Sequence, residues 1–399
     1  MKIVFVNPVG AVGGAERAML TFMKALLEQQ KCPIELHLIV GTEGPLIGQA
    51  QRLGVAVTTL QLPEKFNQLG DSAFKKRNLL EAILLLLLRS LKTLPSLIDY
   101  GKEFKQALEN IQPDLIHSNG IKTHLLTIFA KPKTVPLIWH IHDFYGSRPL
   151  MAKVLKWSSH RAQLGIAISQ AVAKDARVTL PSLPTEVVYN AVDIDYFSPE
   201  VLPTHSPLRI GLVATFARWK GQDIFLKAIA ELRKSYPSLN GVFYIIGGPI
   251  YKTQGSQFSQ QELEEQASHL GISDKVNFLG FQQNIVEIYH WLDIVVHVST
   301  QPEPFGLAIV EAMACGKAVI VSQAGGASEL FTQNEDAIGV PPGDSIALAN
   351  AIADLVNKPE KRQYLSEKAR QTAVQRFNHQ RLGQQLIDIY QAVIAASKT

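Results

Sequence analysis

Short apolar runs rich in β-branched residues alternate with amphipathic stretches along the chain. Such runs are typical of strands buried on both faces, and their alternation with helices indicates parallel α/β layers. The predicted strands of the first half are 2–7, 35–40, 56–60, 115–118, 137–142 and 164–169, with a helix over 15–29. Those of the second half are 208–213, 242–246, 276–279, 294–298 and 318–321. The pattern predicts two doubly wound, Rossmann-like domains.

The two series are separated where the periodicity fades after Asn190 and prolines follow at 199, 203 and 207. A proline-spaced stretch is typical of a linker, and 399 residues fit two domains better than one. We therefore predict an N-terminal domain over 1–200 and a C-terminal domain over 207–380. Ligands of open α/β sheets bind beyond the carboxyl ends of the strands, so we expect a cleft there.

The composition, 46% hydrophobic and 19% charged, is that of a globular protein. A net charge of +4 is too small to indicate nucleic-acid binding without a concentrated patch. Two cysteines, Cys32 and Cys315, fit a reducing cytoplasm, and the apolar surroundings of Cys315 favour a buried thiol. The first strand runs into Asn7-Pro8 too soon for a secretion signal. We expect a cytoplasmic protein.

A leucine-rich segment over 75–92 follows three basic residues, and its uninterrupted apolar core is too short to span a bilayer. One interpretation is a helix packed in the core of the first domain. The other is a basic surface helix that makes peripheral contact with anionic lipid at the inner face of a membrane and brings the protein to a lipid-borne acceptor. The sequence leaves both open.

Two glutamates, Glu303 and Glu311, flank a Pro-Phe-Gly-Leu turn between a predicted strand over 291–298 and a predicted helix over 307–315 that Gly316 ends. The N–H groups at such a helix start attract phosphate, because they are donors at the positive end of the helix dipole. A carboxylate repels phosphate and suits hydroxyl-rich groups. The loop therefore predicts a nucleotide-sugar site, with a sugar on one side of the phosphates and a ribose on the other.

A glycine-rich loop, with Gly10, Gly13 and Gly14, follows the first predicted strand. Glycines at a helix start let the backbone approach a ligand closely, although this spacing differs from the dinucleotide fingerprint. A plain tight turn is the alternative. The position at the carboxyl end of the first strand favours a phosphate or sugar loop.

The segment Trp139 to Phe144 closes another predicted strand and places His140 and His142 on one face, with Asp143 on the other. A sugar-contacting histidine at the strand end is our main interpretation. A structural histidine is the alternative, and a metal site lacks partner ligands at a matching spacing.

Two cations, Arg218 and Lys220, lie at the turn after the first strand of the second domain. They suit a leaving diphosphate, whose developing charge needs compensation in the transition state, and a solvated loop is the alternative. The Asp193-Ile194-Asp195 segment resembles a metal-binding Asp-x-Asp motif, but its place at the linker favours a structural role.

With these pieces together, the chain resembles the retaining GT-B glycosyltransferases of family 4, the glycosyl transferases group 1, over nearly its full length. The matching segments are Gly13 to Glu16, Ile168 to Val172, Tyr189 to Asp193, Phe197 to Pro199, Trp219 to Gly221, Glu303 to Glu311, Gly325 to Glu329 and Pro342 to Asp344. Each segment is a weak signal, whereas the ordered set is a strong one. The resemblance implies a GT-B fold, two Rossmann-like domains facing across a cleft.

The resemblance also implies roles for the matching residues. Glu303 is expected to bind hydroxyls of the donor sugar, Glu311 those of the ribose, and Lys220 the leaving phosphate. His142 falls where the family places a histidine near the transferred sugar, so His142, Lys220 and Glu303 are the expected catalytic residues. The other donor-binding residues expected are Gly13, Gly14, Arg218, Phe281, Phe305, Gly306 and Leu307.

The family implies transfer of a sugar from a UDP- or GDP-sugar to a glycan or lipid-linked acceptor, as in polysaccharide biosynthesis, with retention and without a cofactor or catalytic metal. It also implies that a terminal helix over 381–399 returns to the first domain, with Leu382, Leu386, Ile389 and Val393 as the packed face. A simple last helix of the second domain is the alternative.

The chain departs from the family at Thr215, where members commonly carry an arginine near the lysine of the K-G turn. Arg218 is the candidate replacement. This departure motivates a rival interpretation, a catalytically weak nucleotide-sugar-binding protein, and nucleotide-sugar epimerases of the same architecture are a further rival. We expect Lys220→Ala and Glu303→Ala each to abolish most transfer with the fold intact.

Overall fold

The computed structural model describes residues 1–29, 33–63, 96–200, 205–249 and 255–397. The chain forms two compact units, one of Met1–Tyr189 with His379–Thr399 and one of Asn190–Asn378. The segment 75–92, for which the sequence leaves membrane contact open, and Cys32 lie outside the described residues. No helix in the described ranges is long and apolar enough to cross a membrane.

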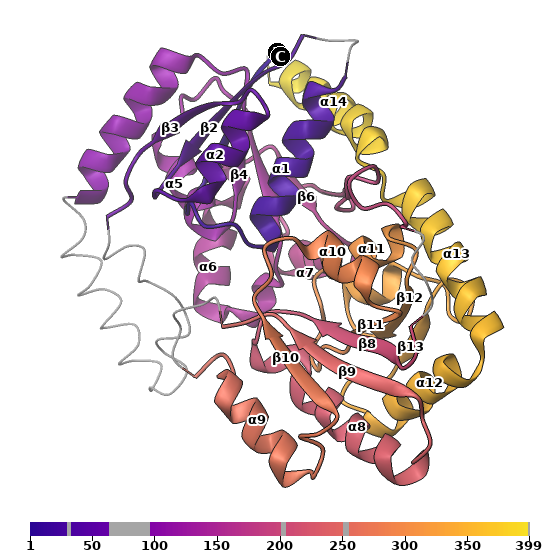
Figure 1. Ribbon diagram of the computed structural model, residues 1–399. Coiled ribbons are helices and arrows are strands. Elements are labelled where there is room, and N and C mark those ends of the chain that lie inside the picture. Colours follow the sequence, from indigo (N-terminus) through magenta and orange to yellow (C-terminus); the bar gives the residue numbers. More distant parts are fainter. Residues whose placement is uncertain (30–32, 64–95, 201–204, 250–254, 398–399) are drawn as a thin grey trace. The chain divides into compact units, whose positions relative to one another are not determined.

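The first unit is built on a seven-stranded parallel sheet in the order β3-β2-β1-β4-β5-β6-β7 (Figure 1). Its strands are β1 (Lys2–Asn7), β2 (Glu35–Val40), β3 (Ala56–Thr59), β4 (Leu115–Asn119), β5 (Leu137–Ile141), β6 (Leu164–Ala167) and β7 (Thr185–Val187). Its named helices are α1 (Gly14–Leu27), α2 (Pro45–Arg52), α5 (Ile121–Ala130), η2 (Tyr145–Ser147), α6 (Pro149–Ser158), η3 (Ser159–Arg161), α7 (Gln170–Thr179) and α14 (His379–Ala396). Strand β1 pairs with both β2 and β4, so the strand order reverses between β1 and β4.

The second unit is built on a six-stranded parallel sheet in the order β10-β9-β8-β11-β12-β13. Its strands are β8 (Leu208–Val213), β9 (Gly241–Ile246), β10 (Val276–Gly280), β11 (Ile294–His297), β12 (Ala318–Ser322) and β13 (Ile338–Val340). Its helices are η4 (Arg218–Lys220), α8 (Gln222–Ser235), α9 (Gln260–His269), α10 (Ile285–Trp291), α11 (Leu307–Ala314), η5 (Gly326–Glu329), α12 (Ser345–Asn357) and α13 (Pro359–Arg376). Here the order reverses between β8 and β11.

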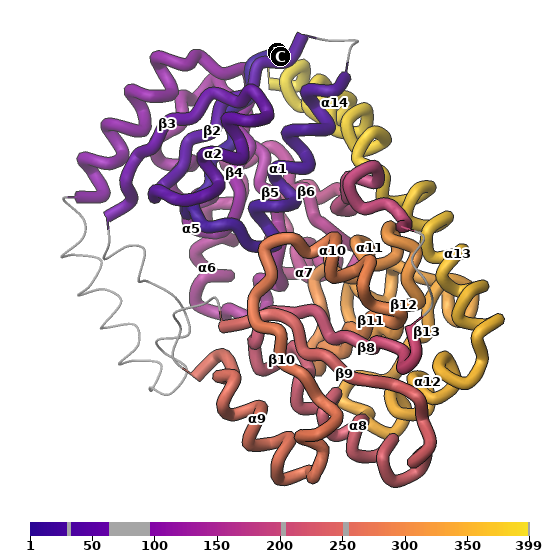
Figure 2. The backbone as a smooth tube through the Cα atoms, viewed as in Figure 1, coloured from indigo at the N-terminus to yellow at the C-terminus, as the bar shows by residue number. Residues whose placement is uncertain are grey.

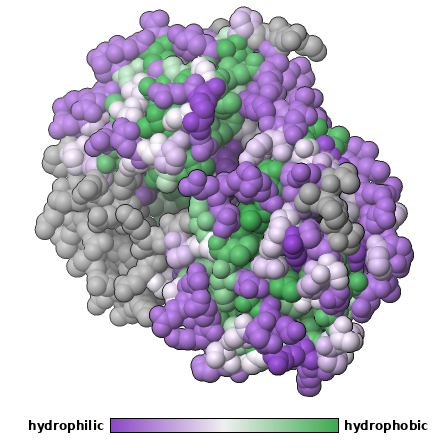
Figure 3. Space-filling view, in the orientation of Figure 1, coloured by the Kyte–Doolittle hydropathy of each residue, from purple (hydrophilic) through white to green (hydrophobic). Residues whose placement is uncertain are grey.

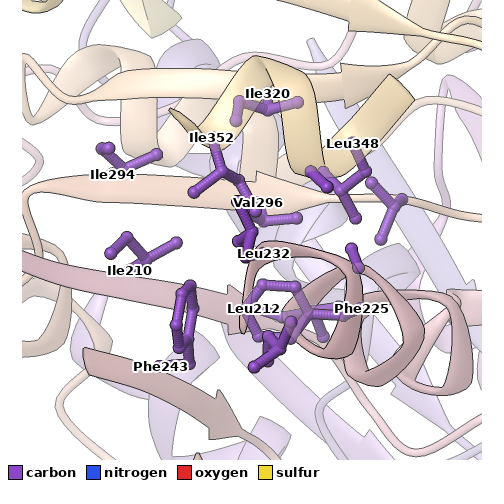
Figure 4. Close-up of a cluster of buried hydrophobic side chains, with 14 of the residues drawn as sticks. Ile210, Leu212, Phe225, Leu232, Phe243, Ile294, Val296, Ile320, Leu348 and Ile352 are labelled. Atoms are coloured by element: carbon purple, nitrogen blue, oxygen red, sulfur yellow. The ribbon is translucent and has the colours of Figure 1, made fainter. Parts of the chain in front are cut away.

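The core of the second unit lies between its sheet and helices α8 and α12. Figure 4 shows Ile210, Leu212 and Val296 of the strands with Phe225 and Leu348 of the helices. Strands buried on both faces explain the near-continuous apolar runs of the sequence. At the surface, Figure 3 shows hydrophilic residues over the region of α9, a helix that buries only Leu263 and Ala267.

The predicted fold class, two α/β domains with parallel sheets, is confirmed. The bounds predicted for β1, β2 and β8 agree with the structure. Strands β7 and β13 were missed because each has three residues and stands at a sheet edge. Two starts were predicted for the strand before the acidic loop: 294 is confirmed and 291 is too early, since Trp291 ends α10 and β11 starts at Ile294.

The division between the units falls at Tyr189 and Asn190, ahead of the predicted boundaries at 200 and 207. The reason is that the chain after Asn190 already packs within the second unit. The Val192 N–H donates to the Phe377 carbonyl at 2.9 Å, and Arg370 donates to the carbonyls of Ile194 and Phe197.

The terminal stretch forms two helices, α13 and α14, with the break at Phe377 and Asn378, so the predicted terminal helix over 381–399 begins at His379. Figure 2 shows α14 beside α1 in the first unit, and the two helices are in contact. The packed face differs in part from the prediction. Leu382, Gly383, Leu386, Ile387 and Tyr390 are buried, whereas Ile389 and Val393 are only partly buried.

Gly383 lies close against the backbone of α1. A Cβ atom there would lie 2.2 Å from the Ala25 carbonyl oxygen, so Gly383→Ala forces the two helices apart. We expect this substitution to lower the free energy of unfolding by about 1–3 kcal/mol, as overpacking does. The measurement is urea unfolding. Gly101→Ala is the control, since a Cβ atom on that helical glycine would have no heavy atom of the described residues within 4 Å and alanine favours a helix. Equal effects of both substitutions would contradict the close contact.

Candidate functional site

The loops after β8 and β11 meet at the carboxyl edge of the second sheet, where its strand order reverses. The Thr300 N–H donates to the Trp219 carbonyl at 2.7 Å. Gly221 has a φ of 82°, and a Cβ atom there would lie 2.0 Å from the Val298 carbonyl oxygen. Only glycine permits both this backbone conformation and this approach. The K-G turn therefore places Lys220 against the loop that carries Glu303.

Lys220 and Glu303 contact each other directly, as Lys220 Nζ lies 2.5 Å from Glu303 Oε2. The Ser299 hydroxyl donates to the same oxygen at 2.9 Å, and His297 Nε2 lies 3.2 Å from it. Both side chains of the ion pair are mostly buried, with 17% of Lys220 and 8% of Glu303 exposed. Because all three contacts are to Oε2, Oε1 is the oxygen of Glu303 that the described residues leave for a ligand.

The carboxyl group of Glu303 is ionised in this environment. Burial by itself would raise its pKa, but the positive charge of Lys220 and the hydrogen bond from His297 hold the pKa well below its usual range. A buried ionised carboxylate is tolerated only where such partners satisfy it.

The Gly325-Gly326 segment holds the backbone of Glu303. The Glu303 N–H donates to the Ala324 carbonyl at 3.2 Å, and the Gly326 N–H donates to the Glu303 carbonyl at 2.7 Å. A Cβ atom on Gly325, whose φ is 67°, would lie 2.6 Å from that carbonyl oxygen. This explains why glycines stand beside the acidic loop.

Helix α11 begins at Leu307, directly after Gly306, whose φ of 103° turns the chain into the helix. Phe305 is buried and lies near the Phe377 ring, which anchors the turn. The N–H groups at the start of a helix have no acceptor within the helix, so this turn presents donors of the kind that bind phosphate. Glu311, in the second turn of α11, is buried and accepts a hydrogen bond from the Tyr289 hydroxyl at 2.8 Å.

Arg218 and Phe281 follow strands β8 and β10 of the second sheet. The Arg218 guanidinium donates to Glu262 at 2.6 Å and lies over the Phe258 ring. Phe281 follows β10 and is 60% exposed. Arg218 and Lys220 thus have different partners, since Arg218 pairs with Glu262 and Lys220 with Glu303.

In the first unit, the glycine-rich loop leads into α1. Glu16 of the first turn accepts a hydrogen bond from the Gly13 N–H at 3.0 Å. Gly10 lies against the 42–43 backbone, where a Cβ atom would be 2.4 Å from the Thr42 carbonyl oxygen. Beside Gly14 there is open space, as a Cβ atom there would have no heavy atom of the described residues within 4 Å.

His142 stands just beyond β5, and its Nε2 atom lies 2.5 Å from Asn119 Oδ1. Burial lowers the pKa of His142 to about 3, so its ring is neutral. His140 is fully buried, with its ring centroid 3.9 Å from that of His142. Asp143 pairs instead with Arg148 at 2.6 Å. The H-x-H-D segment is thus divided among three environments.

Several residues that contact the predicted site residues were not predicted from the sequence. His297 and Ser299 precede Glu303 in an apolar strand and its loop, and Tyr289 lies in a helix 22 positions before Glu311. Of these residues only Asn119 could have been found from the sequence. It ends a buried strand, where a polar residue indicates a ligand site. Asp193 of the Asp-x-Asp segment accepts hydrogen bonds from the N–H groups of Asp195 and Tyr196, as a local turn does.

Two protein families match the chain. The family described as "Glycosyl transferases group 1" matches residues 197–372, and the one described as "Glycosyltransferase Family 4" matches residues 12–196. The "Putative glycosyltransferase EpsD" of Bacillus subtilis is 31% identical over 315 residues, which make up 73% of this chain and 80% of EpsD. The D-inositol 3-phosphate glycosyltransferase of Saccharomonospora viridis is 36% identical over 182 residues, but this match spans only 41% of that protein.

Solved structures are similar over nearly the full chain. HepE of Anabaena, in complex with UDP and glucose, has a TM-score of 0.78 and 26% identity, and the similarity covers 98% of this chain and 99% of HepE. HepE in complex with UDP-glucose is similar to the same degree, with a TM-score of 0.78 and 25% identity. Sucrose-phosphate synthase from Thermosynechococcus elongatus, with a TM-score of 0.76 and 20% identity, shares the fold.

Proposed function

The chain belongs to the glycosyl transferases group 1 family, and on this premise we propose that it is a retaining, metal-independent glycosyltransferase that moves a sugar from a nucleotide diphosphate sugar to a glycan or lipid-linked acceptor. UDP is the nucleotide best supported, because HepE binds UDP and UDP-glucose. The D-inositol 3-phosphate glycosyltransferases and EpsD support the reaction class.

The observation that carries the proposal is the contact between Lys220 and Glu303 beside the start of α11. A leaving diphosphate needs a cation and backbone donors, and the sugar that it leaves needs an acceptor for its hydroxyls. Lys220 has three N–H donors, so it can hold Glu303 and still donate to phosphate. The site thus keeps the two ligand-binding charges of opposite sign in contact before any ligand arrives.

In this proposal Glu303 Oε1 accepts hydrogen bonds from sugar hydroxyls, and Glu311 accepts them from the ribose. The backbone N–H groups of Phe305, Gly306 and Leu307 bind the diphosphate. The nucleobase lies near Phe281, and Gly13 and Gly14 approach the donor or acceptor. Arg218 reaches the phosphates only after it releases Glu262.

The departing phosphate accepts the proton of the acceptor hydroxyl in this proposal, so no protein side chain acts as a general base. Glu303 in particular is not expected to act as a base, since a carboxylate whose pKa lies well below its usual range is a weak base. His142 binds the transferred sugar.

UDP binding tests the donor half of the proposal. A ligand present at roughly 100 times its Kd stabilises the folded state by about 2.7 kcal/mol, which corresponds to a shift of about 5–10 °C for a unit of this size. We expect UDP to raise the unfolding midpoint by this amount, and GDP and ADP to raise it less. Glu311→Gln should reduce the shift, whereas Glu367→Gln on α13 should leave it unchanged. No shift with any of the three nucleotides would contradict a nucleotide-sugar site.

Turnover of labelled UDP-sugars tests the reaction class. We expect slow release of free sugar without acceptor, because water replaces the acceptor hydroxyl. Isomerisation of the donor would identify an epimerase instead. Binding of UDP together with no release of sugar from any UDP-hexose would contradict a competent transferase.

A further inference from the structure

A chain of hydrogen bonds at the carboxyl edge of the first sheet joins His142 to the glycine-rich loop. Asn7 is the last residue of β1 and Asn119 the last residue of β4, so the two stand side by side where the strand order reverses. Both are almost fully buried, with 1% and 2% of the residues exposed. Ligands of open α/β sheets bind at this reversal.

The direction of every hydrogen bond in this series follows from the contacts of Asn7, at the end opposite His142. The Asn7 side-chain nitrogen lies 2.6 Å from the Val9 carbonyl oxygen and 3.3 Å from Glu16 Oε1. A backbone carbonyl and an ionised carboxylate can only accept, so the atom of Asn7 that faces them is its NH2 group. Its Oδ1 atom therefore faces Asn119.

The same reasoning continues along the chain. Because Asn7 presents Oδ1, the atom of Asn119 at 2.7 Å from it must be the NH2 donor. Asn119 Oδ1 then faces His142 Nε2, and an amide oxygen can only accept a hydrogen bond. The proton of a neutral His142 ring must be on Nε2, which leaves Nδ1 as the acceptor of the ring.

We propose that Asn7 and Asn119 are positioning residues that hold His142 in the Nε2-protonated tautomer, so that its Nδ1 atom accepts a hydrogen bond from a hydroxyl of the transferred sugar. This inference rests on the proposed function, in which His142 contacts that sugar. The neutral ring fits it, since burial lowers the pKa of His142 to about 3.

The chain of bonds also links His142 to the start of α1. Glu16, which accepts from Asn7, accepts from the Gly13 N–H as well, at 3.0 Å. A displacement of the glycine-rich loop would therefore be transmitted to the imidazole through two buried amides. Asn7 and Asn119 couple the two ligand-facing parts of the first unit, which are far apart in the sequence.

The first test needs no substrate. The ¹⁵N resonances of the His142 ring distinguish a protonated from a bare nitrogen, and they are assigned by their loss in His142→Gln. We expect Nε2 protonated and Nδ1 bare in the unliganded protein at pH 7.5, and a mixture of tautomers in Asn119→Leu. A bare Nε2 in the wild type, or an unchanged tautomer in Asn119→Leu, would overturn the role of the asparagines.

The second test uses UDP-sugar turnover. We expect Asn119→Leu to lower kcat/KM about 10- to 100-fold, the range for a lost hydrogen bond to a poised group, with the affinity for UDP alone unchanged. Thr127→Val is the matched control, because it removes a buried hydrogen-bonding group elsewhere in the first unit, the hydroxyl of Thr127 on α5. It should cost similar stability and leave both the tautomer and turnover unchanged.

The two tests separate the possible failures. A tautomer that shifts in Asn119→Leu while turnover stays at the wild-type level would show that His142 does not bind the reacting sugar. Absence of turnover in the wild type with every donor would count against the proposed function alone, because the tautomer is still measured. If Asn119→Leu does not fold, the tautomers of His142 in the wild type and in Asn7→Leu decide whether the asparagines hold the ring.

Discussion

Replacing Lys220 with methionine should lower both sugar transfer and the stability of the second unit. Transfer should fall about 10²–10³-fold, because the leaving phosphate loses its cation. The free energy of unfolding should fall by about 3–5 kcal/mol, because Glu303 is left buried without its partner. The sequence-based expectation of an intact fold is therefore revised. The measurements are kcat with a UDP-sugar and urea unfolding at pH 7.5.

A double substitution distinguishes the two effects. In Lys220→Met with Glu303→Gln neither charge is buried, so stability should return to near the wild-type value while transfer stays lost. The matched control is Lys227→Met on α8, because Lys227 is exposed and its pair with Asp223 is as long as 3.7 Å, so its loss should cost little. If Lys220→Met were as stable as Lys227→Met, Glu303 would not depend on its partner.

The pH dependence of this effect has a definite sign. The pKa of Glu303 is lowered in the fold from an ordinary value of 4.5, so its ion pair contributes stability above that pH and loses it as the pH falls further. The stability difference between Lys220→Met and the wild type should therefore shrink below about pH 4.5. A difference that grows on acidification would contradict a buried ionised carboxylate.

Mild acid should unfold the first unit before the second. His117, His124 and His140 are buried within it, and the partly buried His142 packs against His140. Burial lowers the pKa of each, to about 3 for His117 and His142 and well below 6.5 for the other two, and repulsion from neighbouring histidines lowers the pKa of His117, His124 and His140 further. The unfolded chain, in contrast, binds protons near pH 6.5.

The sign follows from this difference. Stability is fully present above about pH 6.5 and falls as the pH drops from there toward 3, by about 1.4 kcal/mol per pH unit for each histidine. Four such groups give an upper limit of about 5.5 kcal/mol per pH unit, enough to unfold a typical domain between about pH 6 and 4. Hydrogen exchange measured at pH 7, 6 and 5 should show loss of protection in β1, β4 and β5 ahead of β8 and β11.

His140→Phe is the informative variant. Both ring nitrogens of His140 lack a hydrogen-bond partner among the described residues, and the ring already lies 4.5 Å from Phe22. A phenyl ring should therefore leave stability at pH 7 unchanged or higher and reduce its pH dependence by about one proton. An unaltered pH dependence, or simultaneous loss of protection in both units, would contradict this origin of acid sensitivity.

Most of the fold was predictable because both sheets are parallel and buried. Strands of that kind are continuous apolar runs that a window of a few residues reveals, as at Lys2–Asn7 and Leu208–Val213. The errors occurred where the apolar signal does not mark the boundary. The run from Trp291 to Val298 is largely apolar but contains Asp293, which accepts a hydrogen bond from the Arg209 N–H at 2.8 Å, a contact with a residue 84 positions away.

The candidate site was predictable in its residue types but not in its contacts. The turn at Gly306 and the buried Cys315 agree with the prediction from local pattern. That Tyr289 holds Glu311, and that Glu262 holds Arg218, could not be read from spacing, because each pair joins elements brought together by packing.

The sequence alone therefore determined which of the longer segments are strands, where the glycine turns lie and which residues could bind a nucleotide sugar. Tertiary structure decided the pairing: Lys220 with Glu303 across 83 positions, Asn7 with Asn119 across 112, and His117 with Tyr390 across 273. The physical reason is that parallel strands neighbour each other through long crossovers. Which strand ends meet at a sheet edge, and hence which polar side chains satisfy one another there, depends on strand order and not on local pattern.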